Sequence, residues 1–151
     1  MSSELVGRMV TKTLPFDGGR QVTVYIPSQS PGLFLFAGDG QTVPSWVPTI
    51  EANQDIPPTM VIGTHRKDDE MERLKEYSLG FDSDKFEKHE RFFVEEVPRW
   101  VEATFGVMLC VERTAVYGVS AGGELALAMG YRHPEVFGAV LCASRRRLQA
   151  T

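Results

Sequence analysis

A serine set among glycines, in the run Tyr117-Gly118-Val119-Ser120-Ala121-Gly122-Gly123, carries the clearest chemical signal in this sequence. An apolar run, 114–117, precedes it, and a helix-forming run of small residues, 121–131, follows it. The pattern Gly-x-Ser-x-Gly between a strand and a helix is typical of a nucleophile elbow, a sharp turn that strains the serine. The helix N-terminus would supply a backbone N–H, from Ala121, to a developing oxyanion. The context favours a nucleophilic Ser120 over an ordinary glycine-rich turn.

Other site chemistries find little support. Neither Gly38-Asp39-Gly40 nor the glycines after Ser120 have the spacing of a phosphate-binding loop or a P-loop lysine. No pair of histidines or cysteines has metal-ligand spacing, so we expect no metal and no cofactor.

Length, charge and cysteine content limit the class of protein. The 151 residues suggest one domain, and the net charge of −4 argues against a nucleic-acid surface. Two cysteines make no disulfide framework, and we expect Cys110 and Cys142 to be small core residues. The start of the chain lacks the pattern of a signal peptide and no apolar run is long enough to cross a membrane. We therefore expect a cytoplasmic protein.

Short apolar runs predict the strands that must position Ser120. A hairpin is expected from a weak strand within 5–14 and a strand at 22–26, joined by a turn at Asp17-Gly18-Gly19. Buried strands are expected at 33–37, 60–63, 114–117 and 138–143.

Periodicity and breakers predict the helices. A short helix is expected over 47–53, capped by Ser45 and with Pro48 in its first turn. A long helix is expected over 84–104, with a kink or break at Pro98, and another from Ser120 to about His133. The polar stretch 65–80 has no clear period and is interpreted as a loop over the sheet edge.

Strands that alternate with helices indicate an α/β domain with a mostly parallel sheet. Sites in such sheets form at the carboxyl ends of the strands. Three segments should therefore meet there: the loop 38–41, the segment that starts at His65, and the Ser120 elbow.

On this framework the chain resembles the three-layer α/β-hydrolase fold. More narrowly it resembles the putative-esterase family, which includes enterochelin esterases, S-formylglutathione hydrolases and mycolyltransferases. The residues that carry the likeness are 35–41, 73–77, 93–100 and 117–138, in that order.

The resemblance implies a role for individual positions. Ser120 would attack an acyl carbonyl and form an acyl-enzyme, and the backbone N–H groups of Ala121 and Gln41 would form the oxyanion hole. The substrate loop would include Asp39, Gly40, Trp46, Arg73 and Glu76. For Arg73 and Glu76 a solvated ion pair is the alternative, and for Trp46 a core position.

The sequence departs from the family pattern after Ser120. In this fold an acid and then a histidine follow the serine along the chain. Only His133 follows here, thirteen residues on, about 20 Å away along a helix. His89 is expected to lie in the long helix, and His65 is the only histidine expected at the correct sheet edge. We expect no imidazole within reach of Ser120.

The expected whole is therefore a partial α/β-hydrolase domain at 1–144, without the family's last strands and helices, and a basic, disordered tail at 145–151. The resemblance implies a serine carboxylic-ester hydrolase that acts on a small-molecule ester and is weak or inactive as this isolated chain. The alternative is a non-catalytic remnant or partner subunit. It would form a homo-oligomer, or bind a complementing chain, through an exposed edge strand, with no nucleic acid and no membrane involved.

Overall fold

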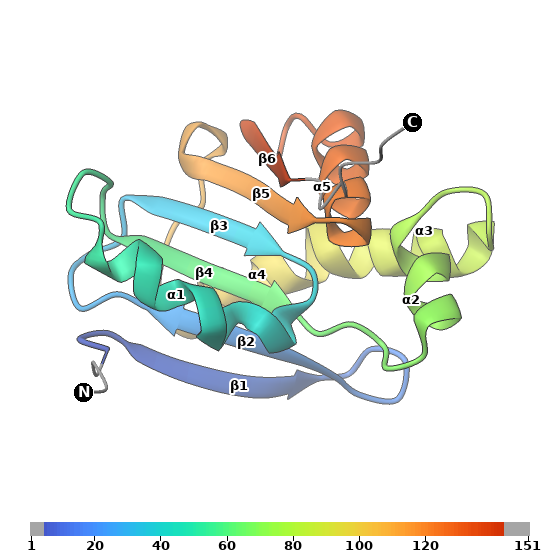
Figure 1. Ribbon diagram of the computed structural model, residues 1–151, viewed down its shortest axis with the longest axis horizontal. Coiled ribbons are helices and arrows are strands. Elements are labelled where there is room, and N and C mark those ends of the chain that lie inside the picture. The colour runs from blue at the N-terminus through green and yellow to red at the C-terminus, as the bar shows by residue number, and fades with distance from the viewer. Residues whose placement is uncertain (1–4, 144–151) are drawn as a thin grey trace, which may run out of the picture.

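The computed structural model describes residues 5–143 of the chain. A six-stranded sheet in the order β1-β2-β4-β3-β5-β6 forms its middle layer (Figure 1). The strands are β1 (Arg8–Leu14), β2 (Arg20–Ile26), β3 (Leu33–Ala37), β4 (Thr59–Thr64), β5 (Thr114–Val119) and β6 (Ala139–Ala143). β1 pairs antiparallel with β2 and β2 with β4, whereas β3 pairs parallel with β4 and β5, and β5 with β6. The expected α/β fold with a mostly parallel sheet is confirmed.

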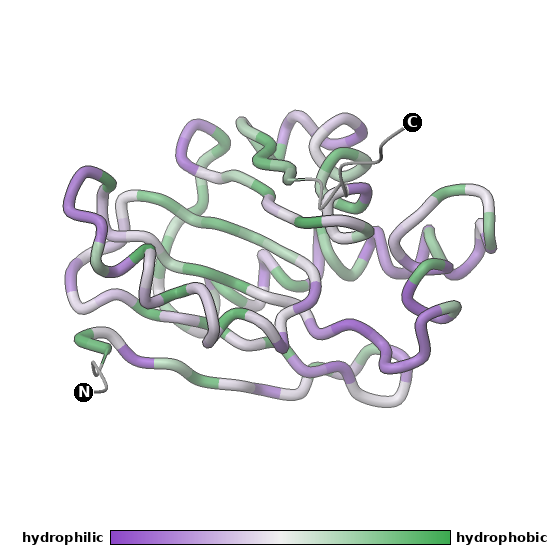
Figure 2. The backbone as a smooth tube through the Cα atoms, viewed as in Figure 1, coloured by the Kyte–Doolittle hydropathy of each residue, from purple (hydrophilic) through white to green (hydrophobic). Residues whose placement is uncertain are grey.

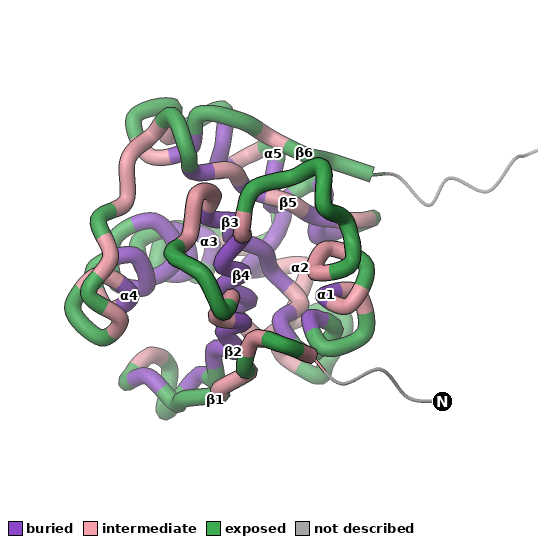
Figure 3. The backbone as a smooth tube through the Cα atoms, turned by 90° about the vertical axis from the view of Figure 1, so that its left-hand side faces the viewer, coloured by how far each residue is buried: buried purple, intermediate pink, exposed green. Residues whose placement is uncertain are grey.

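Helices cover both faces of this sheet. They are α1 (Val43–Ala52), α2 (Glu70–Tyr77), α3 (Ser83–Arg91), α4 (Val97–Phe105) and α5 (Ala121–Arg132). Figure 3, which looks roughly along the strands, shows α1 on one side of the sheet and α3 and α4 on the other. Val43 and Val47 of α1 pack against Leu35 and Val61 in the smaller apolar cluster.

The larger apolar cluster lies on the opposite face. Alternate residues of the strands point into it, and α2, α3, α4 and α5 cover it; its larger members include Phe34, Phe36, Met60, Ile62, Tyr77, Phe86, Phe93, Leu125 and Met129. Figure 2 shows the matching hydropathy, with apolar residues along β3, β4 and β5 and polar ones along the α2–α3 region. Burial of continuous apolar strands between two helical layers is what a parallel sheet requires.

The first hairpin forms where the sequence predicts it. Asp17, Gly18 and Gly19 all have positive φ angles, of 51°, 77° and 118°, between β1 and β2. Glycine adopts such angles without the clash that a Cβ would cause.

Two segments differ from the expectation. The stretch 65–80 contains α2 and is not a loop throughout, because Asp69 accepts a hydrogen bond from the Glu72 N–H and caps the helix. Helix α1 begins at Val43, so Ser45 is inside it and not its cap. Pro48 lies in the helix interior and Pro44 in the first turn, since a short 3₁₀ turn at Gly40–Thr42 leads directly into the helix.

The long helix expected over 84–104 is interrupted before Pro98, as predicted. A π-helical segment, Phe92–Glu96, separates α3 from α4. A proline ring clashes with the carbonyl four residues earlier, which here belongs to Val94, inside the π-helical segment. The wider π turn accommodates the proline without ending the helical path.

Strand β6 is present but is not the buried strand that the sequence predicts. Four of its five residues are exposed, and Cys142, expected in the core, is exposed too. The reason is position: β6 is the last strand of the described sheet and pairs only with β5. Cys110 is partly buried. The expected tail at 145–151 lies outside the described residues.

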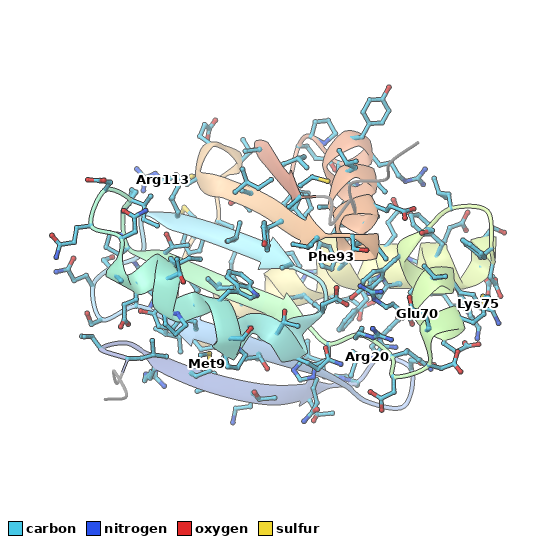
Figure 4. All side chains as sticks on the ribbon, viewed as in Figure 1. Met9, Arg20, Glu70, Lys75, Phe93 and Arg113 are labelled. Atoms are coloured by element: carbon cyan, nitrogen blue, oxygen red, sulfur yellow. The ribbon has the colours of Figure 1, made fainter. Side chains whose placement is uncertain are left out.

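A buried ion pair ties α2 to the sheet. Arg20 at the start of β2 donates two hydrogen bonds of 2.9 Å to the Glu76 carboxylate, and each side chain is 6% exposed. Burial acts to lower the pKa of Arg20, but the hydrogen bond and charge of Glu76 outweigh it and raise that pKa. Figure 4 shows Arg20 at the same end of the molecule as Glu70 of α2.

Removing one partner of this pair should destabilise the fold strongly. We expect Glu76→Gln to lower the free energy of unfolding by about 3–5 kcal/mol, because it leaves the Arg20 charge buried without compensation. Urea unfolding followed by circular dichroism measures the change. The matched control is Lys88→Met, which breaks the exposed pair with Asp84 and should change the free energy by less than about 0.5 kcal/mol. Equal effects of the two substitutions would contradict a stabilising role of the buried Arg20–Glu76 pair.

Candidate active site

Ser120 stands at the junction of β5 and α5 in a strained conformation. Its φ and ψ are 60° and −125°, an unfavourable combination for a residue with a Cβ. Its own backbone groups hold it there: the N–H donates to the Ala143 carbonyl at 3.0 Å, and the carbonyl accepts from the Gly123 N–H at 2.8 Å. The side chain is exposed. These are the features that the sequence predicts for a nucleophile elbow.

The elbow requires its two glycines for steric reasons. A Cβ at Gly118 would lie 1.9 Å from the carbonyl oxygen of Gly122, so strand and helix could not approach as they do. A Cβ at Gly122 would lie 2.9 Å from Oδ2 of Asp39, which belongs to the loop after β3. The Gly-x-Ser-x-Gly pattern therefore fixes two distances: strand to helix, and helix to neighbouring loop.

Two backbone N–H groups are free for an oxyanion among the described residues. The Ala121 N–H opens α5 and has no acceptor in this part of the chain, as expected in the first turn of a helix. The Gln41 N–H, in the 3₁₀ turn after β3, likewise donates to no described group. The Gln41 side chain is occupied elsewhere, because its amide exchanges two hydrogen bonds of 3.0 Å with the Arg66 backbone.

The loop that carries Gln41 follows a left-handed residue. Asp39 has a φ of 52°, and the turn after it is closed by the Thr42 N–H, which donates to the Asp39 carbonyl at 2.9 Å. Gly40 is needed here because a Cβ would lie 2.2 Å from the Gly63 carbonyl oxygen of β4. The loop after β3 is thus packed directly on the neighbouring strand.

Two side chains of α2 hold the Asp39 carboxylate. Arg73 donates to it twice, at 3.1 Å from Nε and 2.8 Å from Nη2. The Tyr77 hydroxyl donates to Oδ1 at 3.2 Å and accepts from the Asp39 N–H at 2.7 Å. Tyr77 is fully buried, and burial, with the Asp39 charge, raises the pKa of its hydroxyl.

A surface hollow of about 420 Å³ joins these elements. Its lining residues are Gly38, Asp39, Thr42, Trp46, Arg73, Tyr117, Gly118, Val119 and Ser120. The expected meeting of the β3 loop, the segment after β4 and the elbow at one sheet edge is confirmed. Trp46 packs against Tyr117, with ring centroids 5.1 Å apart, so it both lines the hollow and belongs to the packing on the α1 face.

Not every residue of the expected substrate loop lines this hollow. Gly40 and Gln41 lie next to it in the 3₁₀ turn, and Ala121 lies at its helical side. Glu76 points to Arg20 instead and is buried, so it is neither in the hollow nor in a solvated ion pair.

None of the chain's three histidines is hydrogen-bonded to Ser120. His133 ends the α5 region and contacts Glu90 at 2.6 Å, and His65 contacts the Thr23 hydroxyl at 2.7 Å. His89 is fully buried, and neither of its ring nitrogens has a hydrogen-bond partner among the described residues. The Ser120 hydroxyl has no hydrogen-bond partner there either. The described residues also contain no cluster of histidine, cysteine and carboxylate side chains that could hold a metal.

Tyr77 is the site residue whose contact the sequence did not reveal. The missed signal was the pattern Asp69-x-x-Glu72, a typical helix start. A helix from there places Arg73 and Tyr77 four residues apart on one face, so both can reach the same carboxylate. Thr42 also lines the hollow and was not expected there.

Comparisons with known proteins agree with this geometry. The family described as Putative esterase matches residues 16–146. Structures with the same fold include the BES protein from Bacillus cereus, at 12% identity and a TM-score of 0.77. An enterochelin esterase from Shigella flexneri has 21% identity and a TM-score of 0.70, and an IroE-like serine hydrolase from Shewanella oneidensis has 16% and 0.69. No match was found among curated protein sequences.

These alignments use most of this chain and part of each neighbour. They cover 96%, 93% and 88% of this chain, and 64%, 36% and 49% of the three structures in the same order. The chain therefore spans about a third to two thirds of their length. Within the described residues no helix has the length and apolar character needed to span a bilayer.

The buried His89 should make stability depend on pH. Burial, its largest cause, lowers the pKa of His89 from 6.5 to about 4. The unfolded chain therefore takes up a proton below about pH 6.5 that the folded protein takes up only near pH 4. Stability is expected to fall by about 3 kcal/mol as the pH drops through this window, and to gain nothing from His89 above it.

His89→Phe should remove this contribution, because phenylalanine does not titrate and the site is lined by Phe16, Tyr77, Phe92 and Phe93. Urea unfolding at several pH values between 4 and 7 measures it for both proteins. Any packing cost of the larger ring is independent of pH, so it does not affect the slope of the free energy of unfolding against pH. Parallel curves for the two proteins would show that His89 does not titrate differently on folding.

Proposed function

The chain belongs to the putative-esterase family, and from this premise we propose that it performs carboxylic-ester chemistry with Ser120 as nucleophile. The support is the elbow: an exposed hydroxyl on a strained turn, at the N-terminus of α5 and in a hollow at the carboxyl ends of the strands. No metal or cofactor takes part in the proposed reaction.

In the proposed reaction the Ser120 oxygen attacks the carbonyl carbon of an ester. The carbonyl oxygen becomes an oxyanion, the bond to the alcohol oxygen then breaks, and the serine proton finally resides on the departing alcohol. Water attacks the acyl-enzyme in the same way, which releases the carboxylic acid and restores the hydroxyl. Atoms and charge balance with ester and water as the only reactants.

The backbone N–H groups of Ala121 and Gln41 are proposed to bind the oxyanion. Both are free of acceptors among the described residues, and each sits in a rigid turn at the edge of the hollow. The positive end of the α5 dipole adds to the same effect. Preorganised donors of this kind are each worth about 2.7–4 kcal/mol of transition-state stabilisation.

The proposed substrate is a small ester that fits the hollow. Trp46 and Tyr117 give it an aromatic wall, and Asp39 with Arg73 gives it a polar one. Because Asp39 and Arg73 neutralise each other, the wall favours an uncharged group of the ester over a free anion. Asp39, Gly40, Trp46 and Arg73 are accordingly proposed as the substrate-side residues, and Glu76 as a support of α2 through Arg20.

Activity of the 151-residue chain is proposed to be weak. A serine hydroxyl needs a base at hydrogen-bond distance, and none of the three histidines contacts Ser120. Serine hydrolases that lack a triad member keep a catalysis of about 10³–10⁴-fold over water, from the oxyanion hole and binding alone. The N–H groups of Ala121 and Gln41 and the hollow beside Ser120 are proposed to supply those two contributions.

Hydrolysis of p-nitrophenyl acetate by the purified chain tests this proposal. We expect slow, saturable turnover together with acetylation of Ser120, which intact mass spectrometry detects. Ser120→Ala should abolish the acetylation, whereas the part of the turnover that comes from the oxyanion hole and binding should remain. Ser45→Ala, which removes an exposed hydroxyl on α1, is the matched control and should retain the activity.

Two results would count against it. A wild-type chain that is not acetylated at Ser120, or acetylation that Ser120→Ala leaves unchanged, would reject Ser120 as the nucleophile. A kcat in the ordinary enzyme range of about 1–10³ s⁻¹ would reject the absence of a base instead.

A second candidate function is a non-catalytic partner subunit, favoured by β6. The outer edge of β6 pairs with no described strand, and Leu141 on it is 51% exposed. Helix α5 packs closely on β6, as the 2.1 Å between a Cβ at Gly130 and a Val140 methyl shows, and it exposes Leu127 and Tyr131. Unpaired apolar edges bind other strands.

If this candidate is correct, the chain should self-associate through β6. Size-exclusion chromatography with light scattering is expected to give a dimer or larger species at micromolar concentration, and Leu141→Lys should shift it to monomer, because a charge on an edge strand opposes pairing. Met108→Lys, at a residue that is 83% exposed outside this surface, is the matched control. A well-folded wild-type monomer would contradict the partner function and leave the esterase proposal standing.

A further inference from the structure

Helix α2 directs two neighbouring side chains at one carboxylate. Arg73 and Tyr77 lie one turn apart and both contact Asp39, at distances of 2.8–3.2 Å. The Arg73 contact uses both Asp39 oxygens and two guanidinium nitrogens, an arrangement that fixes orientation as well as distance. The Tyr77 hydroxyl also receives the Asp39 N–H, so it binds backbone and side chain of the same residue.

Asp39, the residue that Arg73 and Tyr77 bind, sets the direction of the loop after β3. Asp39 has a left-handed φ of 52°, which a residue with a Cβ adopts only when its surroundings hold it there. The next two residues are Gly40 and Gln41, and the N–H of Gln41 is free. A change in the Asp39 backbone angles would turn that N–H away from its present direction.

The same carboxylate also contacts the elbow. Asp39 Oδ2 lies 2.9 Å from the position of a Cβ at Gly122, which follows Ala121 in the first turn of α5. The Asp39 side chain is thus in contact with both turns that carry a free N–H group. The carboxylate therefore occupies the space beside Gly122 that a side chain would need.

Arg73 is committed to this contact and is not available to a charged substrate. Its side chain is 11% exposed and bonded to Asp39 and also to Glu70, at 3.0 Å. Burial acts to lower the pKa of Arg73, but the hydrogen bonds and charges of Asp39 and Glu70 outweigh it and raise that pKa. The guanidinium is therefore charged and already bonded to two carboxylates.

We propose that Arg73 and Tyr77 are positioning residues for the oxyanion hole: through the Asp39 carboxylate they hold the Gln41 N–H in line with the Ala121 N–H. The inference rests on the proposed roles of Ser120, Ala121 and Gln41, and it assigns to α2 a task in the reaction that none of its side chains performs by touching the reacting atoms.

Labelling of Ser120 by an alkyl fluorophosphonate tests the proposal on the 151-residue chain. The serine oxygen attacks phosphorus, fluoride leaves, the hydroxyl proton passes to water, and the phosphoryl oxygen occupies the oxyanion hole. Intact mass spectrometry gives the second-order rate constant. We expect Arg73→Met to lower it about 10- to 100-fold, less than the 10²–10³-fold that loss of a whole donor costs.

Three further variants separate positioning from general damage. Arg73→Lys keeps the charge but not the two-pronged contact, so it should restore part of the rate, to within about 10-fold of wild type. Tyr77→Phe keeps the ring in the core and removes the hydroxyl, and it serves if Arg73→Met does not fold. Lys75→Met breaks the pair with Glu72 on the same helix and should leave the rate within about 2-fold, as expected for a partly exposed pair.

Amide hydrogen exchange gives a readout that does not depend on the serine chemistry. The Thr42 N–H donates to the Asp39 carbonyl and closes the turn that carries Gln41. Arg73→Met and Tyr77→Phe should therefore speed the exchange of the Thr42 amide at least about 10-fold. The amide of Phe36 in β3 is the control and should be unaffected. Unchanged exchange together with unchanged labelling, or an equal loss in Lys75→Met, would overturn the positioning role. A wild-type chain that is not labelled at Ser120 would overturn the proposed nucleophile, while faster Thr42 exchange in the variants would still support the hold of α2 on the loop.

Discussion

The close approach of β5 and α5 at Ser120 is the constraint on which the rest of the site depends. The two backbones meet with only 1.9 Å between the Gly122 carbonyl oxygen and a Cβ placed on Gly118. Such contact is open only to glycine, and it forces the intervening serine into its strained angles. The exposure of the hydroxyl and the free N–H of Ala121 both follow from this one turn.

Electrostatic contacts extend that constraint to the neighbouring loops. Helix α2 is short and polar, and two ion pairs fasten it: Glu76 to Arg20 of β2, and Arg73 to Asp39 after β3. Both pairs are nearly closed to solvent, where opposite charges attract more strongly than at the surface. The helix is therefore held to the sheet by charge and hydrogen bonding as much as by its apolar anchors, the fully buried Tyr77 and the partly buried Leu74.

The sequence was sufficient for the sheet and for the elbow, since both depend on short-range patterns. Apolar runs between breakers located the strands, and Gly-x-Ser-x-Gly located Ser120 between strand and helix. Helix α2 was missed because its apolar residues are too few for a clear period, although its capping residues were present. The exposure of β6 and Cys142 was missed because an apolar run looks the same in a central strand and in an edge strand. The contact of Tyr77 with Asp39 joins residues 38 positions apart and required the fold.

The π-helical segment Phe92–Glu96 has a consequence for the layer that covers the larger apolar cluster. A π turn contains one residue more than the α turn it replaces, and each helical residue advances the side-chain direction by about 100°. The surplus residue thus decouples the facing of α3 from that of α4, and each can present its own apolar side to the strands. Deleting a single residue there would turn α4 by about 100° relative to α3 and move Val97 and Val101 away from the cluster that they now pack into. The π-helical segment therefore sets the rotation of α4 about its axis relative to α3.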